Sequence, residues 1–160
     1  MPYALFLKKQ NFKFSSSHFT IFSDSQAEFL HGHNYQVAVK IQLEDVDKKT
    51  EMAVDFNIVK KAVRSLCDEM DEKILLPKNS TFLKISESPH YKKHTEVRFQ
   101  DRIYCFPSNE IFYVDANNVT SESLARFIHQ QLAKGLSFKT FSVTVYETAG
   151  QAASYQSLPT

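Results

Sequence analysis

The chain has 160 residues, a net charge of +1 and 42% hydrophobic residues, all ordinary values for one soluble globular domain. Its scattered basic residues argue against binding to nucleic acid or to an acidic membrane surface. The start of the chain lacks a signal-peptide pattern, and no segment reaches the roughly 20 apolar residues of a membrane span. Cys67 and Cys105 are its only cysteines, so we expect one reduced, cytoplasmic domain over residues 1–160.

Two strands are predicted near the start of the chain. In residues 12–18, FKFSSSH, alternation places His18 on the same face as two phenylalanines. In residues 31–43 the odd positions begin with His31 and His33 and continue with apolar residues, while most even positions are polar. This alternation is typical of a strand with one buried face.

The rest of the chain predicts two helices, a hairpin and a last strand. Apolar residues at helical spacing and potential N-caps indicate the helices. The expected elements are a helix at 55–75, a polar loop at 77–95, a hairpin at 95–106 turning at Gln100–Asp101, a helix at 120–135 and a strand at 139–147. This order predicts an α+β fold around a mainly antiparallel sheet.

Three histidines form a candidate metal site. Sequential strands usually pair, so His18 on the first strand can meet His31 and His33 on the second. Three imidazoles with an open fourth position are typical of catalytic zinc. The alternative is three ordinary hydrogen-bonded histidines. The apolar setting and Gly32, one of only three glycines, favour the metal. The remaining histidines are interpreted as surface residues: His90, His94 and His129.

Five blocks in the same order resemble the 6-pyruvoyltetrahydropterin and 6-carboxytetrahydropterin synthase family. They are FKFSSSH, LHGHNYQV, MAVDFNIVKKAV, NNVTSESLARFI and VTVYETAGQAASY. The resemblance implies the tunnelling fold, in which an antiparallel four-stranded sheet carries two helices on one face. It also implies trimers that close into a barrel, a homohexamer of two stacked barrels, and active sites between subunits.

The resemblance assigns roles to residues of these blocks. It implies zinc on His18, His31 and His33, and pterin-binding roles for four further residues: Thr120, Ser121, Glu122 and Glu147. A buried carboxylate such as Glu147 could accept the two parallel donors of a pterin edge. Alternatively, Glu147 lies in water beyond the buried part of its strand. Thr120 and its two successors can equally serve as capping residues of the second helix.

The sequence departs from the family at two positions. Ala27 stands where many members have the catalytic cysteine, while Glu28 is retained. The family's Leu-Asp-His appears as Met70-Asp71-Glu72, so Asp71 matches and Glu72 replaces the histidine. Glu28, Asp71 and Glu72 are the candidate catalytic residues. Glu28 could instead be a solvated loop residue, and Glu72 part of a charged helix end.

These departures favour a branch of the family that lacks the cysteine. Its implied reaction cleaves the side chain of 7,8-dihydroneopterin triphosphate to 6-hydroxymethyl-7,8-dihydropterin. Glu28 would be the general base, with a pKa raised by apolar surroundings. The alternatives are a 6-pyruvoyl or 6-carboxy synthase working without the cysteine, and an inert relative that binds zinc and a pterin.

Overall fold

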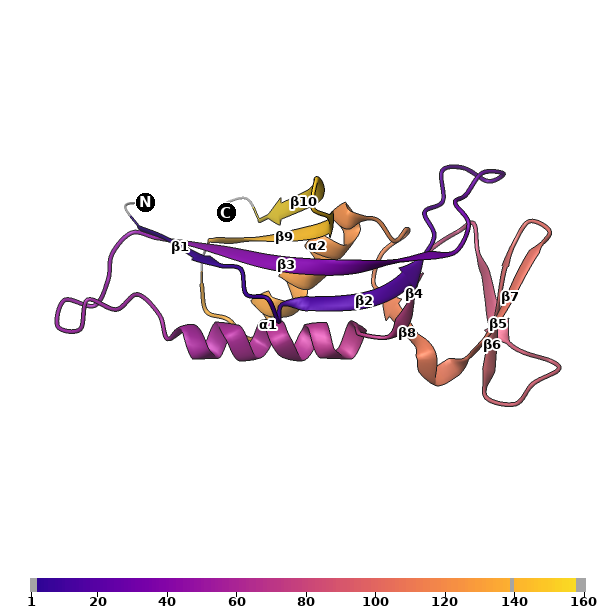
Figure 1. The fold of residues 1–160 in the computed structure, drawn as a ribbon, viewed down its shortest axis with the longest axis horizontal. Helices are drawn as coiled ribbons and strands as arrows, with labels where there is room; N and C mark the ends of the chain where they lie inside the picture. Colours follow the sequence, from indigo (N-terminus) through magenta and orange to yellow (C-terminus); the bar gives the residue numbers. More distant parts are fainter. Residues whose placement is uncertain (1–2, 139, 158–160) are drawn as a thin grey trace.

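The computed structural model describes residues 3–138 and 140–157, so both ends of the predicted domain lie outside the described residues. Position 139 of the predicted last strand lies outside them as well. One large sheet forms the centre of the chain, and a small sheet lies at one end (Figure 1).

The large sheet has seven strands, built around the long strand β3 (His31–Leu43). The strands β2 (Lys13–His18), β9 (Phe141–Thr148) and β1 (Tyr3–Leu7) pair with β3 and run antiparallel to it. The antiparallel β10 (Gln151–Gln156) forms one edge, and beyond β2 follow the parallel strands β4 (Lys73–Pro77) and β8 (Ile111–Val114), of which β8 forms the other edge.

Both helices cover one face of this sheet. Helix α1 (Phe56–Met70) begins at the N-cap Asp55, and α2 (Ser121–Ala133) begins at the N-cap Thr120. Their apolar residues form one core cluster with the side chains of β3 that alternate with polar residues, such as Tyr35. His31 and His33 share the parity of Tyr35, so they extend this core-facing row toward one end of β3.

The small sheet consists of β5 (Lys84–Glu87), β6 (His94–Phe99) and β7 (Arg102–Pro107), followed by the short 3-10 helix η1 (Ser108–Glu110). A second apolar cluster joins this sheet to the segment after β2 and includes Phe19, Ile21 and Phe99. The small sheet therefore supports the segment that leads from β2 to β3.

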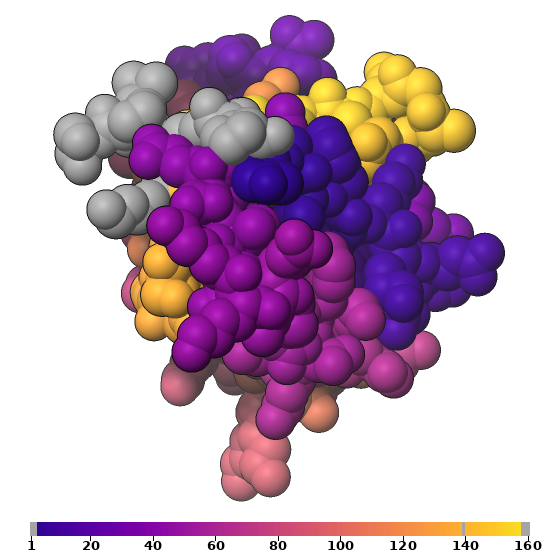
Figure 2. All heavy atoms as spheres, turned by 90° about the vertical axis from the view of Figure 1, so that its left-hand side faces the viewer, coloured from indigo at the N-terminus to yellow at the C-terminus, as the bar shows by residue number. Residues whose placement is uncertain are grey.

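Figure 2 views the opposite end of the molecule, where the chain passes from β3 into α1.

The predicted α+β class is confirmed, with both helices on one face. The predicted four-stranded sheet is wrong in size, because short strands that carry no clear alternation add to it. The helix predicted for 55–75 ends at Met70, and its last residues belong to β4. The loop predicted for 77–95 contains β5, while the hairpin at 95–106 turns at Gln100–Asp101 as predicted.

The interpretation of His129 as a surface residue is wrong. Only 4% of its surface is exposed, and its ring stacks on Phe141 at a centroid distance of 4.1 Å. Its Nε2 lies 3.1 Å from the Phe141 carbonyl oxygen, so a buried imidazole donates there instead of meeting water. Neither helix of the described part of the chain has the length and apolar character needed to cross a membrane.

Candidate metal centre and active site

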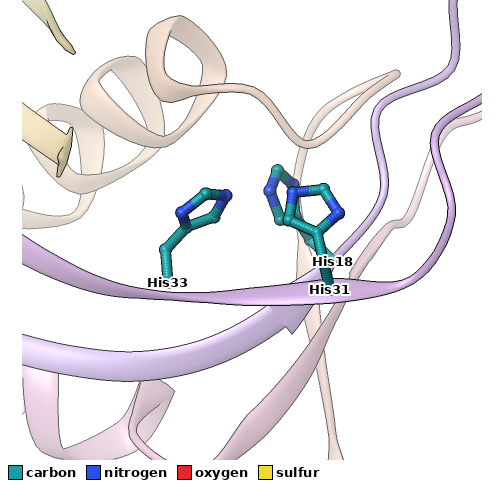
Figure 3. A group of neighbouring side chains, drawn as sticks. All are labelled: His18, His31 and His33. Carbon is teal, nitrogen blue, oxygen red and sulfur yellow. The ribbon is translucent and has the colours of Figure 1, made fainter.

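Pairing of β2 with β3 brings the three predicted histidines together. His18 lies directly opposite His31, and His33 lies two residues further along β3 (Figure 3). Their ring centroids are 4.8, 5.3 and 4.8 Å apart, and their ligand atoms lie within 4.8 Å of one another. Among the described residues, this candidate metal-binding group contains no fourth side chain. An antiparallel register thus produces three convergent donors.

Backbone carbonyls fix the orientation of two of these rings. His18 Nδ1 lies 3.0 Å from the Val119 carbonyl oxygen, and His31 Nδ1 lies 2.7 Å from that of Phe29. Because a carbonyl can only accept, each Nδ1 carries the hydrogen, and in a neutral ring the lone pair is then at Nε2. This is the arrangement in which metal-binding histidines are usually held.

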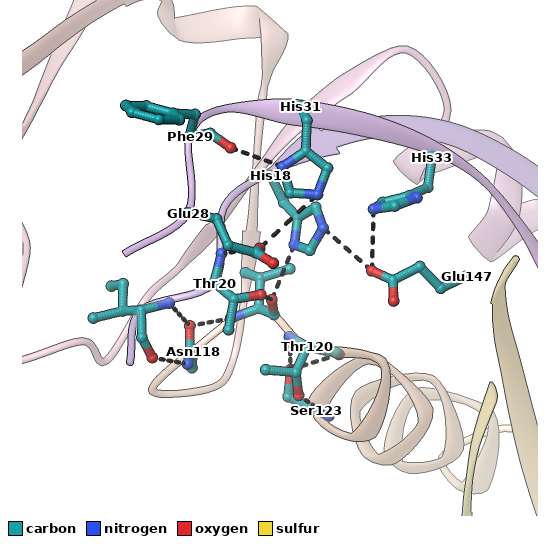
Figure 4. Close-up of polar contacts among 12 residues, drawn as sticks. His18, Thr20, Glu28, Phe29, His31, His33, Asn118, Thr120, Ser123 and Glu147 are labelled. Atoms are coloured by element: carbon teal, nitrogen blue, oxygen red, sulfur yellow. Dashed lines mark hydrogen bonds and ion pairs between the residues drawn. The ribbon is translucent and has the colours of Figure 1, made fainter. Parts of the chain in front are cut away.

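The Nε2 atoms of His18 and His33 are buried and make no hydrogen bond. Glu147 Oε1 lies 3.5 Å and 3.1 Å from them, at ion-pair distance but without hydrogen-bond geometry (Figure 4). Burial lowers the pKa of His18 and the proximity of His31 and His33 acts in the same direction, although the hydrogen bond to Val119 and the carboxylate of Glu147 act in the opposite direction. Buried nitrogens without a hydrogen-bond partner in this arrangement fit a divalent cation, and an imidazole set suits zinc.

Glu28 lies at the rim of the histidine cluster. Its Oε2 is 3.9 Å from His31 Nε2 and accepts a hydrogen bond from the Thr20 N–H at 2.9 Å. Partial burial raises its pKa, but the hydrogen bonds from Thr20 and the nearby histidines outweigh burial, so the net shift is downward. The expected raised pKa is therefore wrong, because Thr20 stabilises the ionised carboxylate.

The start of α2 lies directly beside the cluster, because the carbonyl that holds His18 belongs to the residue before Thr120. The Thr120 hydroxyl accepts from the Ser123 N–H at 3.2 Å, and the Ser123 hydroxyl accepts from the Thr120 N–H at 2.9 Å. Thr120 is thus a capping residue as predicted. A hydrogen bond from Thr120 lowers the pKa of Glu122. Ser121 is the first residue of the helix.

Asp71 and Glu72 lie elsewhere in the subunit. The Asp71 carboxylate accepts from the Ser15 N–H at 2.7 Å, just after the end of α1. Glu72, with a φ of 57°, lines a hollow of about 380 Å³ together with residues of β2 and β3, among them Ser15, Ser17 and His33. On β2, Ser15 and Ser17 alternate with His18, so their side chains point to the face of the sheet opposite that of His18. Neither carboxylate belongs to the three-histidine group, although Glu72 and His33 line the same hollow.

Sequence reasoning missed the groups that hold the segment between β2 and β3. Asn118 brackets Ile21, accepting from its N–H at 3.1 Å and donating to its carbonyl at 2.8 Å. Arg102 donates to two carbonyls of the same segment. Asn118 lies two residues before Thr120 in the block NNVTSESLARFI. Its position close to a predicted site residue could have suggested a role at the site. Arg102 carries no local signal, because its partners are more than 70 residues away.

A family model described as 6-pyruvoyl tetrahydropterin synthase matches residues 7–157. The chain belongs to this family. A provisionally named 6-carboxy-5,6,7,8-tetrahydropterin synthase from Methanocaldococcus jannaschii is 31% identical over 153 residues, 90% of this chain and 89% of the relative. A named 6-carboxy-5,6,7,8-tetrahydropterin synthase from Aquifex aeolicus is 28% identical over 134 residues, 79% of this chain and 74% of the relative.

Solved structures of the family share the fold, and one of these proteins has a catalytic glutamate. The 6-pyruvoyltetrahydropterin synthase of Plasmodium vivax, solved as a variant with a catalytic glutamate replaced by alanine, superposes with a TM-score of 0.88. It is 26% identical, and the match covers 97% of each chain. The predicted tunnelling fold and the predicted branch, with glutamate in place of cysteine, are therefore confirmed. As a family member, this chain is a lyase-type enzyme of pterin metabolism.

Proposed function

We propose that this family member is a zinc-dependent lyase that cleaves the side chain of 7,8-dihydroneopterin triphosphate, giving 6-hydroxymethyl-7,8-dihydropterin. The observation that carries the proposal is the position of Glu28, whose carboxylate lies 3.9 Å from His31 Nε2 beside a cluster that lacks a cysteine. Glu28 is ionised by its contact with Thr20, so it is present as a base. The free thiols lie elsewhere, at Cys67 in α1 and Cys105 in β7.

His18, His31 and His33 would hold the zinc ion, which when bound would lower the pKa of coordinated side-chain hydroxyls. Glu28 accepts the proton of the C2′ hydroxyl. The C2′–O bond becomes a carbonyl as the C1′–C2′ bond breaks, and the electron pair moves into the C6=N5 imine of the ring. The leaving fragment is a two-carbon aldehyde that carries the triphosphate, and a proton returns to C1′. A positioned carboxylate base can contribute roughly 10²–10⁴-fold to such a step.

We assign pterin binding to the groups on the other side of the cluster. Glu147 lies at the end of β9, with its side chain 23% exposed, so its carboxylate is open to a ligand with two parallel donors. Thr120, Ser121 and Glu122 at the start of α2 would bind the remaining polar edge of the ring. Binding from this side would leave the pterin side chain facing the histidines and Glu28.

Asp71 and Glu72 lie outside the three-histidine group of their own subunit, and an active site shared between subunits would bring them to another group of histidines. We therefore propose a homohexamer in the cytoplasm, in which these two residues act at the histidines of a neighbouring subunit. Mixing inactive Glu72→Ala subunits with inactive His31→Ala subunits should restore part of the activity, because some sites then contain both groups. Absence of recovery in mixed oligomers that retain their zinc would contradict the shared site, and full activity of Glu72→Ala alone would remove Glu72 from the mechanism.

The names of the curated relatives favour a second candidate, a 6-carboxytetrahydropterin synthase. Chromatographic identification of the product from dihydroneopterin triphosphate separates the two candidates. We expect 6-hydroxymethyl-7,8-dihydropterin from the zinc-loaded protein and loss of that product in Glu28→Gln, while Glu44→Gln, an exchange on a surface carboxylate after β3, should retain it. A 6-carboxy or 6-pyruvoyl product instead would overturn the proposal, and no turnover at all would favour an inert relative.

A further inference from the structure

Arg102 makes an unusual contact with the segment that carries Glu28. Its two terminal nitrogens donate to consecutive backbone carbonyls, Nη1 to Glu28 at 2.6 Å and Nη2 to Ala27 at 3.0 Å. Among the described residues Arg102 forms no ion pair with a carboxylate, although a half-buried guanidinium usually has one. The fork therefore binds main chain, in a two-point geometry that fixes both the position and the direction of the segment.

Aromatic rings hold the guanidinium itself in place. Its Cζ lies 5.1 Å from the centroid of Phe99 and 5.4 Å from that of Phe29, within the range of cation–π attraction. Phe99 is buried in the second apolar cluster, so one side of the guanidinium rests on a rigid part of the small sheet. Phe29 is 81% exposed, so its ring is held mainly by Arg102.

The clamped segment controls two functional groups. Glu28 provides the carboxylate, and the next carbonyl, that of Phe29, accepts from His31 Nδ1 at 2.7 Å and so sets the orientation of that ring. On the inner side the segment is held by reciprocal bonds between Thr20 and Glu28. On the outer side Arg102 holds two consecutive carbonyls, and Gln100 at the hairpin tip also donates to the carbonyl of Asp24.

We propose that Arg102 is a positioning residue of the active site, which clamps the Ala27–Glu28 backbone and so aligns the Glu28 carboxylate and the His31 ring. The part that concerns Glu28 rests on the proposed function, whereas the part that concerns His31 rests on the hydrogen bonds alone. The two guanidinium hydrogen bonds of Arg102 go to the backbone of this segment, so in this role it acts through that backbone and not on the reacting atoms. Its effect should therefore appear in the turnover number and in the geometry of the metal site.

The variants Arg102→Lys and Arg102→Ala test the clamp, because lysine keeps the charge but cannot bind two carbonyls as a fork. Arg98→Lys and Arg98→Ala are matched controls on β6 of the same sheet, where the guanidinium pairs with Glu96 at 2.8 Å. In the zinc enzyme we expect kcat to fall about tenfold to hundredfold in both Arg102 variants, as for a displacement of about 1 Å. The KM for the pterin should stay unchanged, because Glu147 is untouched.

Three further measurements separate positioning from general stability. Cobalt-substituted protein should show altered visible absorption bands in Arg102→Ala but not in Arg98→Ala, because only the former frees the Ala27–Glu28 backbone that leads into the Phe29 carbonyl, which orients His31. Millimolar guanidinium ion should restore part of the kcat of Arg102→Ala, while ammonium ion should not. Thermal unfolding of the metal-free variants should show similar losses for Arg102→Lys and Arg98→Lys.

Particular results of these experiments would overturn the proposal. Wild-type kcat in Arg102→Lys, or a raised KM with unchanged kcat, would show that the fork does not position the base. An unchanged cobalt spectrum in Arg102→Ala would refute the link to His31. Full activity of Glu28→Gln would refute the proposed function but not the clamp on His31, which the spectrum tests separately.

Discussion

Removal of one histidine should abolish a large zinc-dependent gain in stability. The change is His31→Ala, chosen because the side chain of His31 is 37% exposed and its ring makes one hydrogen bond, to Phe29. Its loss should therefore disturb the metal-free protein little. The expected cost is about 0.5–1.5 kcal/mol, the usual net value of one hydrogen bond, and partial exposure favours the lower end.

The gain from zinc should exceed this cost. A ligand present at 100 times its Kd stabilises the folded state by about 2.7 kcal/mol. For a chain of this size each kcal/mol raises Tm by about 2–4 °C, so saturating zinc should raise the wild-type Tm by about 5–11 °C. In His31→Ala two imidazoles remain, at His18 and His33, and we expect most of this increment to disappear.

The assay is thermal unfolding after removal of metal, with and without added zinc. His94→Ala is a matched control, because His94 Nδ1 also lies close to the carbonyl oxygen two residues before it, at 2.9 Å from Lys92. His94→Ala should keep the full zinc increment. The metal assignment is refuted if zinc fails to stabilise the wild type, or if it stabilises His31→Ala as much as the wild type.

Three further predictions follow from particular contacts. Gly32→Ala places a Cβ 3.3 Å from the Ser16 carbonyl oxygen, so a zinc titration should show weaker binding. The Tm should change little, because alanine in a strand is more favourable than glycine by about 0.5–1 kcal/mol. Unchanged zinc affinity would refute this prediction. A thiol reagent should label the exposed Cys105 in the native protein but not Cys67, because burial raises the pKa of the Cys67 thiol to about 12. Cys105→Ser should keep full activity. Loss of turnover in that variant would show that a cysteine takes part in the reaction. Burial lowers the pKa of His129 below its ordinary 6.5, so the unfolded chain takes up the proton first and the free energy of unfolding should fall as pH drops below 6.5. Urea unfolding at pH 7 and pH 5 should show a smaller loss of stability in His129→Gln than in the wild type. An equal loss in both proteins would contradict this prediction.

The histidine cluster could be predicted because its geometry is local. Alternation along the segment starting at His31 gives the face, and pairing with the preceding strand supplies His18, so two elementary rules place all three rings. The buried position of His129 could not be predicted in this way. Its partner Phe141 lies on another element of the fold. From the sequence alone, a polar residue such as His129 on a helix predicts a solvent-exposed position.

The position of Asp71 and Glu72 outside the three-histidine group could not be predicted from the sequence either. Both follow directly on α1, and the direction in which the chain leaves the helix decides which face of the sheet they reach. Glu72 has a φ of 57° and bonds to the Ser15 carbonyl, a turn that no residue type at that position requires. Strands β4 and β8 were missed for a similar reason, since two short parallel strands lack the alternation of a half-buried strand.

The structure also changes how the missing cysteine should be understood. Ala27 packs against the second apolar cluster and bridges to Ile21, so a thiol at that position would lie among apolar side chains. Glu28, one residue later, is the group beside His31. Its lowered pKa keeps it ionised near neutral pH but also makes it a weak proton acceptor. A weak base can remove a hydroxyl proton only if another group acidifies that hydroxyl. In the proposed reaction, the bond from Thr20 would therefore increase the dependence on a cation held by the three histidines, compared with a carboxylate of raised pKa.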